Sequence, residues 1–142
     1  MIMELCKYMV EDDEDGIPRT PFVIGSTLFA LAVDSDTIDE CVVVAESAPG
    51  LVDGLLVDYR QIPLVVYSRA KTRFTARDNA YTVFDLLQST TGKIQVDLPA
   101  IGSGPIYTCN FECRTPYYTG LDESGRRYVF AMPVDVTVTN MT

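Results

Sequence analysis

The sequence predicts a single α/β (α+β) domain, with a mixed, mostly antiparallel sheet of about four to five strands flanked by an N-terminal helix and a central helix. Residues 62–67 form a near-continuous apolar run rich in β-branched and aromatic side chains, which is typical of a strand buried on both faces. Residues 74–87 then repeat apolar side chains every three or four positions, as in an amphipathic helix. Residues 107–113 alternate apolar and polar side chains, and in residues 128–138 large apolar side chains alternate with mainly polar residues, which predicts two strands paired antiparallel.

The spacing of apolar residues and the positions of glycine and proline predict the elements of the N-terminal part. Apolar residues at i, i+3, i+4 and i+7 predict a helix from residue 2 to about residue 13, where acidic residues oppose the helix dipole and a glycine and a proline follow. Short strands are expected at residues 28–33 and 41–45, with a turn at 34–37 between them. Residues 47–54 read as a loop hinged on glycine.

The central strand is expected to start within residues 55–61. Pro63 has no amide hydrogen, so it predicts a bulge or an edge position that splits this strand in two. The helix after Lys71 should run to about Ser89, capped by Thr72 or Thr75 and stopped near Gly92. Its buried face should hold Phe74, Ala80, Tyr81, Phe84 and Leu87.

Composition excludes several classes of protein. The 142 residues fit one domain, and 47 % hydrophobic with 22 % charged residues is a globular composition. No apolar run approaches the roughly 20 residues of a membrane span, and the first residues do not resemble a secretion signal. The four cysteines form no CxxC pair, so we expect reduced core thiols rather than disulfides. The absence of histidine removes the Ser–His–Asp and Cys–His nucleophile systems and His-based metal sites.

The net charge of −9 is unevenly distributed. Residues 1–58 hold 13 acids and 2 bases, whereas residues 59–142 hold 7 acids and 9 bases. One interpretation is an ordinary acidic surface. The other is a head-to-tail contact in which the acidic flank of one copy meets the basic flank of the next, a type of contact that can close into a ring. The acidic excess disfavours tight binding to a phosphate backbone.

Five bases near the strand–helix junction are candidate subunit-interface residues, either a solvated rim or a contact for an acidic partner, and no aromatic stacking pattern accompanies them. They are Arg60, Arg69, Lys71, Arg73 and Arg77. The GSG at residues 102–104 precedes a strand, unlike a phosphate loop. Asp122 and Glu123 fit a turn better than a catalytic pair. We therefore expect no catalytic, cofactor or metal site.

The order of parts resembles the tail terminator (tail completion, or minor capsid) proteins of long-tailed bacteriophages. The similarity spans residues 55–139: a strand ending in VVYSRA with Arg69, a helix over residues 72–87, Thr115–Pro116, and the turn LDESGRRYVF before the last strand. The matching turn and strand residues are Asp122, Gly125, Arg126, Tyr128 and Phe130. The acidic run at residues 11–15 and the break at Pro63 depart from that layout.

This resemblance implies one tail-terminator-like domain over residues 1–142, in a non-enzymatic virion protein at the head-proximal end of the tail, assembled in the host cytoplasm. Such proteins form a hexameric ring that caps the tube of the major tail protein, ends tail elongation, joins head–tail connector proteins, and lets genomic DNA pass without specific binding. Acidic side chains in the channel would repel phosphates. The candidates for this acidic flank or channel lining are Glu11, Asp12, Asp13, Glu14, Asp15, Asp34, Asp36, Asp39 and Glu40.

Two other functions stay open from the sequence. A head-completion or other minor capsid or connector protein could share this layout. From a different class, a small cytoplasmic ligand-binding or enzymatic domain would place its site at Tyr67, Arg69 and Asp78.

Overall fold

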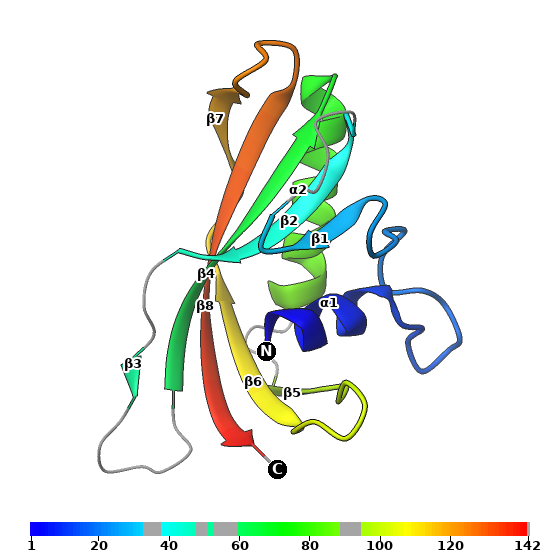
Figure 1. Ribbon diagram of the computed structural model, residues 1–142, viewed down its shortest axis with the longest axis vertical. Helices are drawn as coiled ribbons and strands as arrows, with labels where there is room; N and C mark the ends of the chain where they lie inside the picture. Colours follow the sequence, from blue (N-terminus) through cyan, green and yellow to red (C-terminus); the bar gives the residue numbers. More distant parts are fainter. Residues whose placement is uncertain (33–37, 48–50, 53–59, 89–94, 142) are drawn as a thin grey trace.

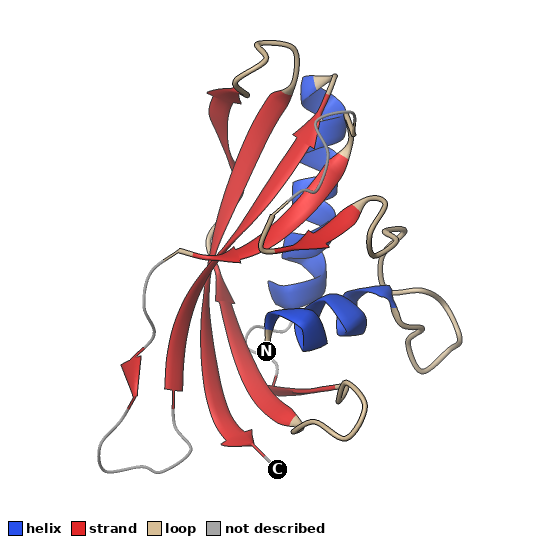
Figure 2. Ribbon diagram, viewed as in Figure 1, coloured by secondary structure: helices blue, strands red, loops and turns tan. Residues whose placement is uncertain are grey.

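The computed structural model describes residues 1–32, 38–47, 51–52, 60–88 and 95–141, which form one curled sheet with two helices (Figures 1 and 2). The helices are α1 (Ile2–Val10) and α2 (Arg73–Gln88). The strands are β1 (Leu28–Ala30), β2 (Cys41–Glu46), β3 (Leu51–Val52), β4 (Arg60–Ala70), β5 (Gln95–Leu98), β6 (Tyr107–Cys113), β7 (Tyr117–Leu121) and β8 (Tyr128–Met141). The predicted α+β class is confirmed, but four to five strands was too few, because β3, β5 and β7 were not predicted.

The long strands β4 and β8 form the centre of the sheet. The strand order is β1-β2-β4-β8-β6-β5, with β3 added beside β4 and β7 beside β8. Among the described strands, β1 and β2 pair in parallel and all other pairs are antiparallel. The predicted antiparallel pairing of residues 107–113 with 128–138 is confirmed as β6 and β8. Because β8 pairs with β6 along one half and β7 along the other, the sheet fans apart at both ends (Figure 1).

Pro63 does not split the central strand, so that prediction was wrong. β4 is continuous, and Pro63 pairs with Asp135 of β8 without a register shift. The Pro63 carbonyl accepts a hydrogen bond from the Ser47 N–H at 3.0 Å, on the side where the β2 ladder ends. The ladder to β3 begins only at Gln61. The missing N–H therefore faces the end of the β2 ladder and not β8, so the pairing of β4 with β8 is not interrupted.

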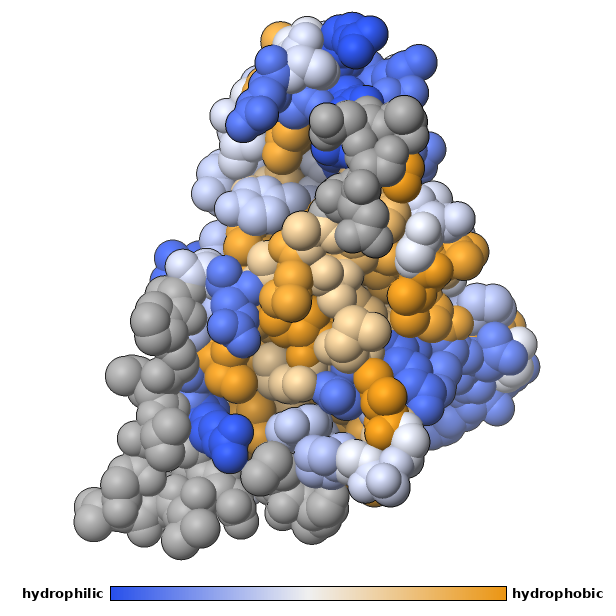
Figure 3. Space-filling view, in the orientation of Figure 1, coloured by the Kyte–Doolittle hydropathy of each residue, from blue (hydrophilic) through white to orange (hydrophobic). Residues whose placement is uncertain are grey.

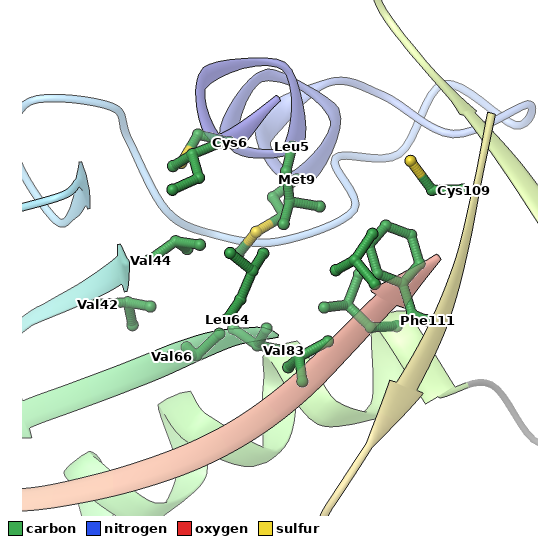
Figure 4. Packing of buried hydrophobic residues seen from close by; sticks show 14 of the residues in the cluster. Leu5, Cys6, Met9, Val42, Val44, Leu64, Val66, Val83, Cys109 and Phe111 are labelled. Atoms are coloured by element: carbon green, nitrogen blue, oxygen red, sulfur yellow. The ribbon is translucent and has the colours of Figure 1, made fainter. Parts of the chain in front are cut away.

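Both helices pack on the same face of the sheet. From α1, Leu5 and Met9 point toward Leu64 and Val66 of β4, and all four are almost fully buried (Figure 4). α2 lies behind β1 and β2 in the view of Figure 1 and buries its residues Val83 and Leu87 in the same core. A two-layer arrangement of this kind buries alternate residues of each strand.

Among the described residues no helix covers the opposite face of the sheet, so the expectation that the central strand is buried on both faces holds only in part, at Val65. Val43, Tyr67, Ala131 and Tyr117 are aligned in one row across β2, β4, β8 and β7. Tyr67 is 42 % exposed. A continuous apolar area occupies the centre of the molecular face turned to the viewer in Figure 3.

Element ends differ from the sequence expectations for local reasons. α1 ends at Val10 because Glu11 is already extended (φ −72°, ψ 157°), so the acidic run is not helical. β1 stops at Ala30, and the next residue, Leu31, has a left-handed φ of 71°. The turn at 34–37, the start of the central strand at 55–59, and Ser89 and Gly92 lie outside the described residues.

The buried face of α2 was only partly predicted. Its buried residues are Ala76, Ala80, Val83 and Leu87, whereas the Phe74 side chain is 80 % exposed. At about 100° per residue, Phe74 lies roughly 200° from Ala76 and faces away from the sheet. Thr72 is the residue that caps the helix, because its hydroxyl oxygen accepts the Thr75 N–H at 3.2 Å.

Candidate interface surfaces

The five candidate interface bases do not form one cluster. Arg60 begins β4 and Arg69 lies near its other end, so strand rise alone separates them by about 30 Å. Arg69, Lys71, Arg73 and Arg77 lie at the junction of β4 and α2, together with the turn between β7 and β8. Arg60 is therefore outside any single contact surface made by the other four.

Two of the bases at the junction are engaged inside the molecule. The Lys71 Nζ lies 3.1 Å from Asp39, and the Arg127 Nε donates to Asp39 Oδ1 at 2.9 Å. The Arg69 Nη2 donates to the carbonyl of Ile38. These contacts bind the segment before β2 to the ends of β4 and β8, so they hold the fold together and leave little of this charge for a partner.

Asp122 and its neighbours shape the turn between β7 and β8. The Ser124 hydroxyl donates to Asp122 Oδ1 at 2.6 Å, and the Arg127 Nη1 donates to Asp122 Oδ2 at 3.3 Å. The Ser124 hydrogen bond is the main cause that lowers the pKa of Asp122, and the Arg127 hydrogen bond is the main cause that lowers the pKa of Asp39. Gly125 takes a φ of 70°, which favours glycine in this turn. Glu123 and Arg126 are exposed beside it.

The other two bases, Arg73 and Arg77, are presented on a surface that sequence reasoning missed. The Arg73 guanidinium lies 4.7 Å from the centre of the Tyr118 ring, and the Arg77 guanidinium lies 4.6 Å from that of Tyr81. Counting about 100° per residue, Phe74 falls on the same flank of α2. We call Arg73, Phe74, Arg77, Tyr81 and Tyr118 the arginine–aromatic strip. The absence of an aromatic pattern in the sequence was misleading, because Tyr118 arrives from β7.

Small residues beneath the strip bring α2 close to the sheet. Ala70, Ala76 and Ala80 form a second buried cluster with Phe130. The Tyr118 ring packs against Phe130 at 5.6 Å between ring centres, and against Tyr128 at 6.1 Å. These ring contacts hold Tyr118 in place, and the Arg73 guanidinium lies over the same ring. Among the described residues, neither Arg73 nor Arg77 forms an ion pair with a carboxylate.

The acidic run forms an ordered loop at residues 11–19, which we call the acidic loop. Its two ends are joined by the bridge between Asp12 and Pro18 and by the Arg19 N–H, which donates to the Glu11 carbonyl at 3.1 Å. Asp13 braces it from inside, because its Oδ1 accepts the N–H groups of Asp15 and Ile17 at 2.9 and 3.0 Å. The carboxylates of Asp12, Glu14 and Asp15 are exposed, and Glu11 is only loosely paired with Lys7, at 3.8 Å.

Of the remaining acidic candidates, two are paired within the molecule and two lie outside the described residues. Asp39 is bound by Lys71 and Arg127 as described, and the Glu40 Oε1 accepts a hydrogen bond from the Asn79 side chain of α2 at 2.9 Å. Asp34 and Asp36 lie outside the described residues. The nine acids therefore do not make one continuous flank within the part of the chain that the structure describes.

The residues proposed for an enzyme-type site are not brought together. Tyr67 and Arg69 line a shallow, mostly apolar pocket of about 200 Å³ on the uncovered face of the sheet, with Cys41 and Asp122. Asp78 lies on α2, which packs against the opposite face. Within the described ranges no three Cys, Asp or Glu side chains are placed to share a metal ion.

All four thiols are free, as the sequence predicted. Burial raises the pKa of Cys6 to about 11 and those of Cys109 and Cys113 to about 12, and it also raises the pKa of Cys41. A thiol with a raised pKa is a poor nucleophile at neutral pH. Cys6, Cys109 and Cys113 pack in or against the main core, whereas the buried Cys41 lines the pocket on the uncovered face of the sheet.

Comparison with known proteins adds no family. No protein-family model matches the chain, and no curated protein sequence matches it. No helix among the described residues is long and apolar enough to cross a membrane. The proposals below therefore depend on the geometry of the chain and on the resemblance described above.

Proposed function

We propose that this chain is a structural subunit of a bacteriophage tail. Copies of it form a ring, hexameric in the tail terminator proteins that the chain resembles, which caps the tail tube, ends its elongation and offers the tail-side surface to the head–tail connector. Genomic DNA passes through the ring without specific binding. In this role the protein is located at the head-proximal end of the virion tail and catalyses no reaction.

The observation that carries the proposal is the arginine–aromatic strip. Tyrosine and arginine are the residues most enriched at the energetic centres of protein interfaces. Here two arginines lie over tyrosine rings, so their side chains lose less freedom when a partner binds. Phe74, which is 80 % exposed, adds apolar area on the same flank. A surface of this composition fits an assembly protein better than a small-molecule enzyme.

The genetic test is a phage in which a stop codon replaces an early codon of this gene. We expect tails of uncontrolled length that fail to join heads, counted by negative-stain electron microscopy, with recovery when the wild-type chain is supplied from a plasmid. Tails of normal length in the mutant would exclude the capping role. If those normal tails also fail to join heads, the alternative role in head completion would be favoured.

The biochemical test is the mass of the assembly on purified tails. We expect density for a ring at one tail end and a bound mass close to six times the 15.7 kDa of the chain. Tails purified from the stop-codon mutant are the control. The absence of the chain from mature tails would contradict the proposal.

A further inference from the structure

We propose that the arginine–aromatic strip of one copy binds the acidic loop of the next copy, an assignment that rests on the proposed ring and names the contact that builds it. The two surfaces are opposite in charge, and both are exposed. Each also carries an apolar side chain: Phe74 on the strip and Ile17, which is 60 % exposed, on the loop.

The charged side chains of both surfaces can bind a partner. Asp12, Glu14 and Asp15 have no described base within ion-pair distance, and Arg73 and Arg77 have no described acid. Opposite charges at an interface steer association and exclude wrong partners. In this pair an acidic, partly apolar projection has a basic, aromatic counterpart.

Contacts within the molecule hold both surfaces in the conformation that would bind. On the strip, Arg73 lies over Tyr118, which is packed against Phe130. The acidic loop is anchored at its base by Arg19, whose guanidinium lies 4.0 Å from the centre of the Tyr8 ring and donates to the Tyr8 carbonyl at 3.1 Å. Binding between preorganised surfaces loses little conformational entropy.

The contact must form between copies. The acidic loop projects at the right of the molecule in Figure 1, whereas β7 and the start of α2 lie at its upper end. A molecule therefore cannot place its own loop on its own strip. Since the two surfaces differ, the contact is head-to-tail, which either closes into a ring or continues as a filament. This assigns residues 11–15 to the contact between subunits and not to the channel wall.

Disulfide trapping between full-length chains tests the contact at any affinity. A chain with Ile17→Cys is mixed with a chain carrying Phe74→Cys under mild oxidation, and the mixed dimer is measured by mass spectrometry. The control replaces Phe74→Cys with Ile106→Cys, another exposed apolar position, in the loop before β6. We expect the mixed dimer in excess with Phe74→Cys and its loss when Arg73→Glu and Arg77→Glu are added to that chain. Equal yields with Ile106→Cys would overturn the proposal.

Charge exchange then tests specificity. Adding Asp12→Lys, Glu14→Lys and Asp15→Lys to the Ile17→Cys chain should abolish trapping by the original strip and restore it with the strip carrying Arg73→Glu and Arg77→Glu. Failure of the exchanged pair, with both chains folded by circular dichroism, would refute the contact. Competition by an added single-stranded oligonucleotide that binds the strip directly would instead assign the strip to nucleic acid.

The outcomes separate this contact from the proposed function. Rings on tails without trapping would mean that the ring uses another surface, and the capping role would stand. Trapping with only open filaments, and normal tails in the stop-codon phage, would remove the capping role and leave the contact.

Discussion

The Arg127 guanidinium lies against Asp39, with 2.9 Å between Nε and Oδ1, although the two residues are 88 positions apart in the chain. Arg127 is almost fully buried, and its second ion pair is to Asp122 at 3.3 Å. Lys71 approaches Asp39 from the end of β4. One carboxylate thus connects the segment before β2, the β4–α2 junction and the start of β8.

This arrangement predicts an acid-dependent loss of stability. The pKa of Asp39 is lowered in the folded chain, chiefly by the Arg127 hydrogen bond, so its contribution is complete above the ordinary pKa of about 3.9 and falls as the pH drops below it. We expect Asp39→Asn to lower the melting temperature at pH 7, with a difference from wild type that shrinks below about pH 4. Asp12→Asn, at an exposed position, is the control and should change little at either pH. A difference for Asp39→Asn that stays constant with pH would contradict this explanation.

The cysteines predict the opposite behaviour at high pH. Burial raises the pKa of Cys109 from 9.0 to about 12, so the folded chain keeps the neutral thiol while the unfolded chain ionises. Its contribution is complete below pH 9.0 and falls as the pH rises toward 12. We expect the stability advantage of wild type over Cys109→Ala, measured by urea unfolding, to be smaller at about pH 10.5 than at pH 7. An advantage that grows with pH would show that the thiol ionises in the folded state.

Two phenylalanines should differ sharply in their effect on stability. Phe111 on β6 is 1 % exposed and packs in the main core, whereas Phe74 is 80 % exposed. Phe111→Ala should lower the free energy of unfolding by about 3–5 kcal/mol, and Phe74→Ala by less than about 0.5 kcal/mol. Chemical denaturation of the two variants measures both. A large loss for Phe74→Ala would mean that its side chain is covered within the monomer.

The helix cap supplies a smaller and more local effect. The Thr72 hydroxyl accepts the Thr75 N–H, so Thr72→Ala should lower the free energy of unfolding by about 1 kcal/mol. Thr75→Ala is the control, since it keeps the backbone N–H and the accepting oxygen and loses only the exposed hydrogen bond that the Thr72 hydroxyl donates to Thr75 Oγ1, so it should cost less than about 0.5 kcal/mol. The same denaturation assay distinguishes them. The reverse order would identify Thr75 as the capping residue.

The sequence predicted the elements in which one periodicity dominates. Residues 107–113 alternate apolar and polar side chains, and residues 134–138 of β8 do the same, because one face of both strands is buried there, so both strands and their pairing were found. β7 was missed because all of its side chains from Tyr117 to Thr119 are exposed and Gly120 interrupts it, which leaves no burial pattern. In the first half of α2, the side chains packed on the sheet are Ala76 and Ala80, and the larger Phe74 was mistaken for a residue of the buried face.

The candidate surfaces could be predicted only where they are local. The acidic loop is contiguous in the chain and was recognised. The strip was half recognised through Arg73 and Arg77, but Tyr118 lies 45 residues beyond Arg73 and no spacing rule connects them. Arg127 was likewise absent from the candidates, since its partner Asp39 is distant in sequence. The packing of β7 and β8 brings these distant residues into contact, so the contacts can be identified only from the folded structure.

The place of β8 in the chain also sets the order of folding. β8 follows β4, β6 and β7, yet it pairs with all three. The longest ladder, between β4 and β8, joins residues 60–70 to residues 128–138 and cannot start until β8 has left the ribosome. Contacts so far apart in sequence slow folding, because a long loop must close before any of them forms. The nascent chain therefore keeps β4 without its main partner while residues 71–127 are made, so the arrival of β8 is the event that permits the centre of the sheet to assemble.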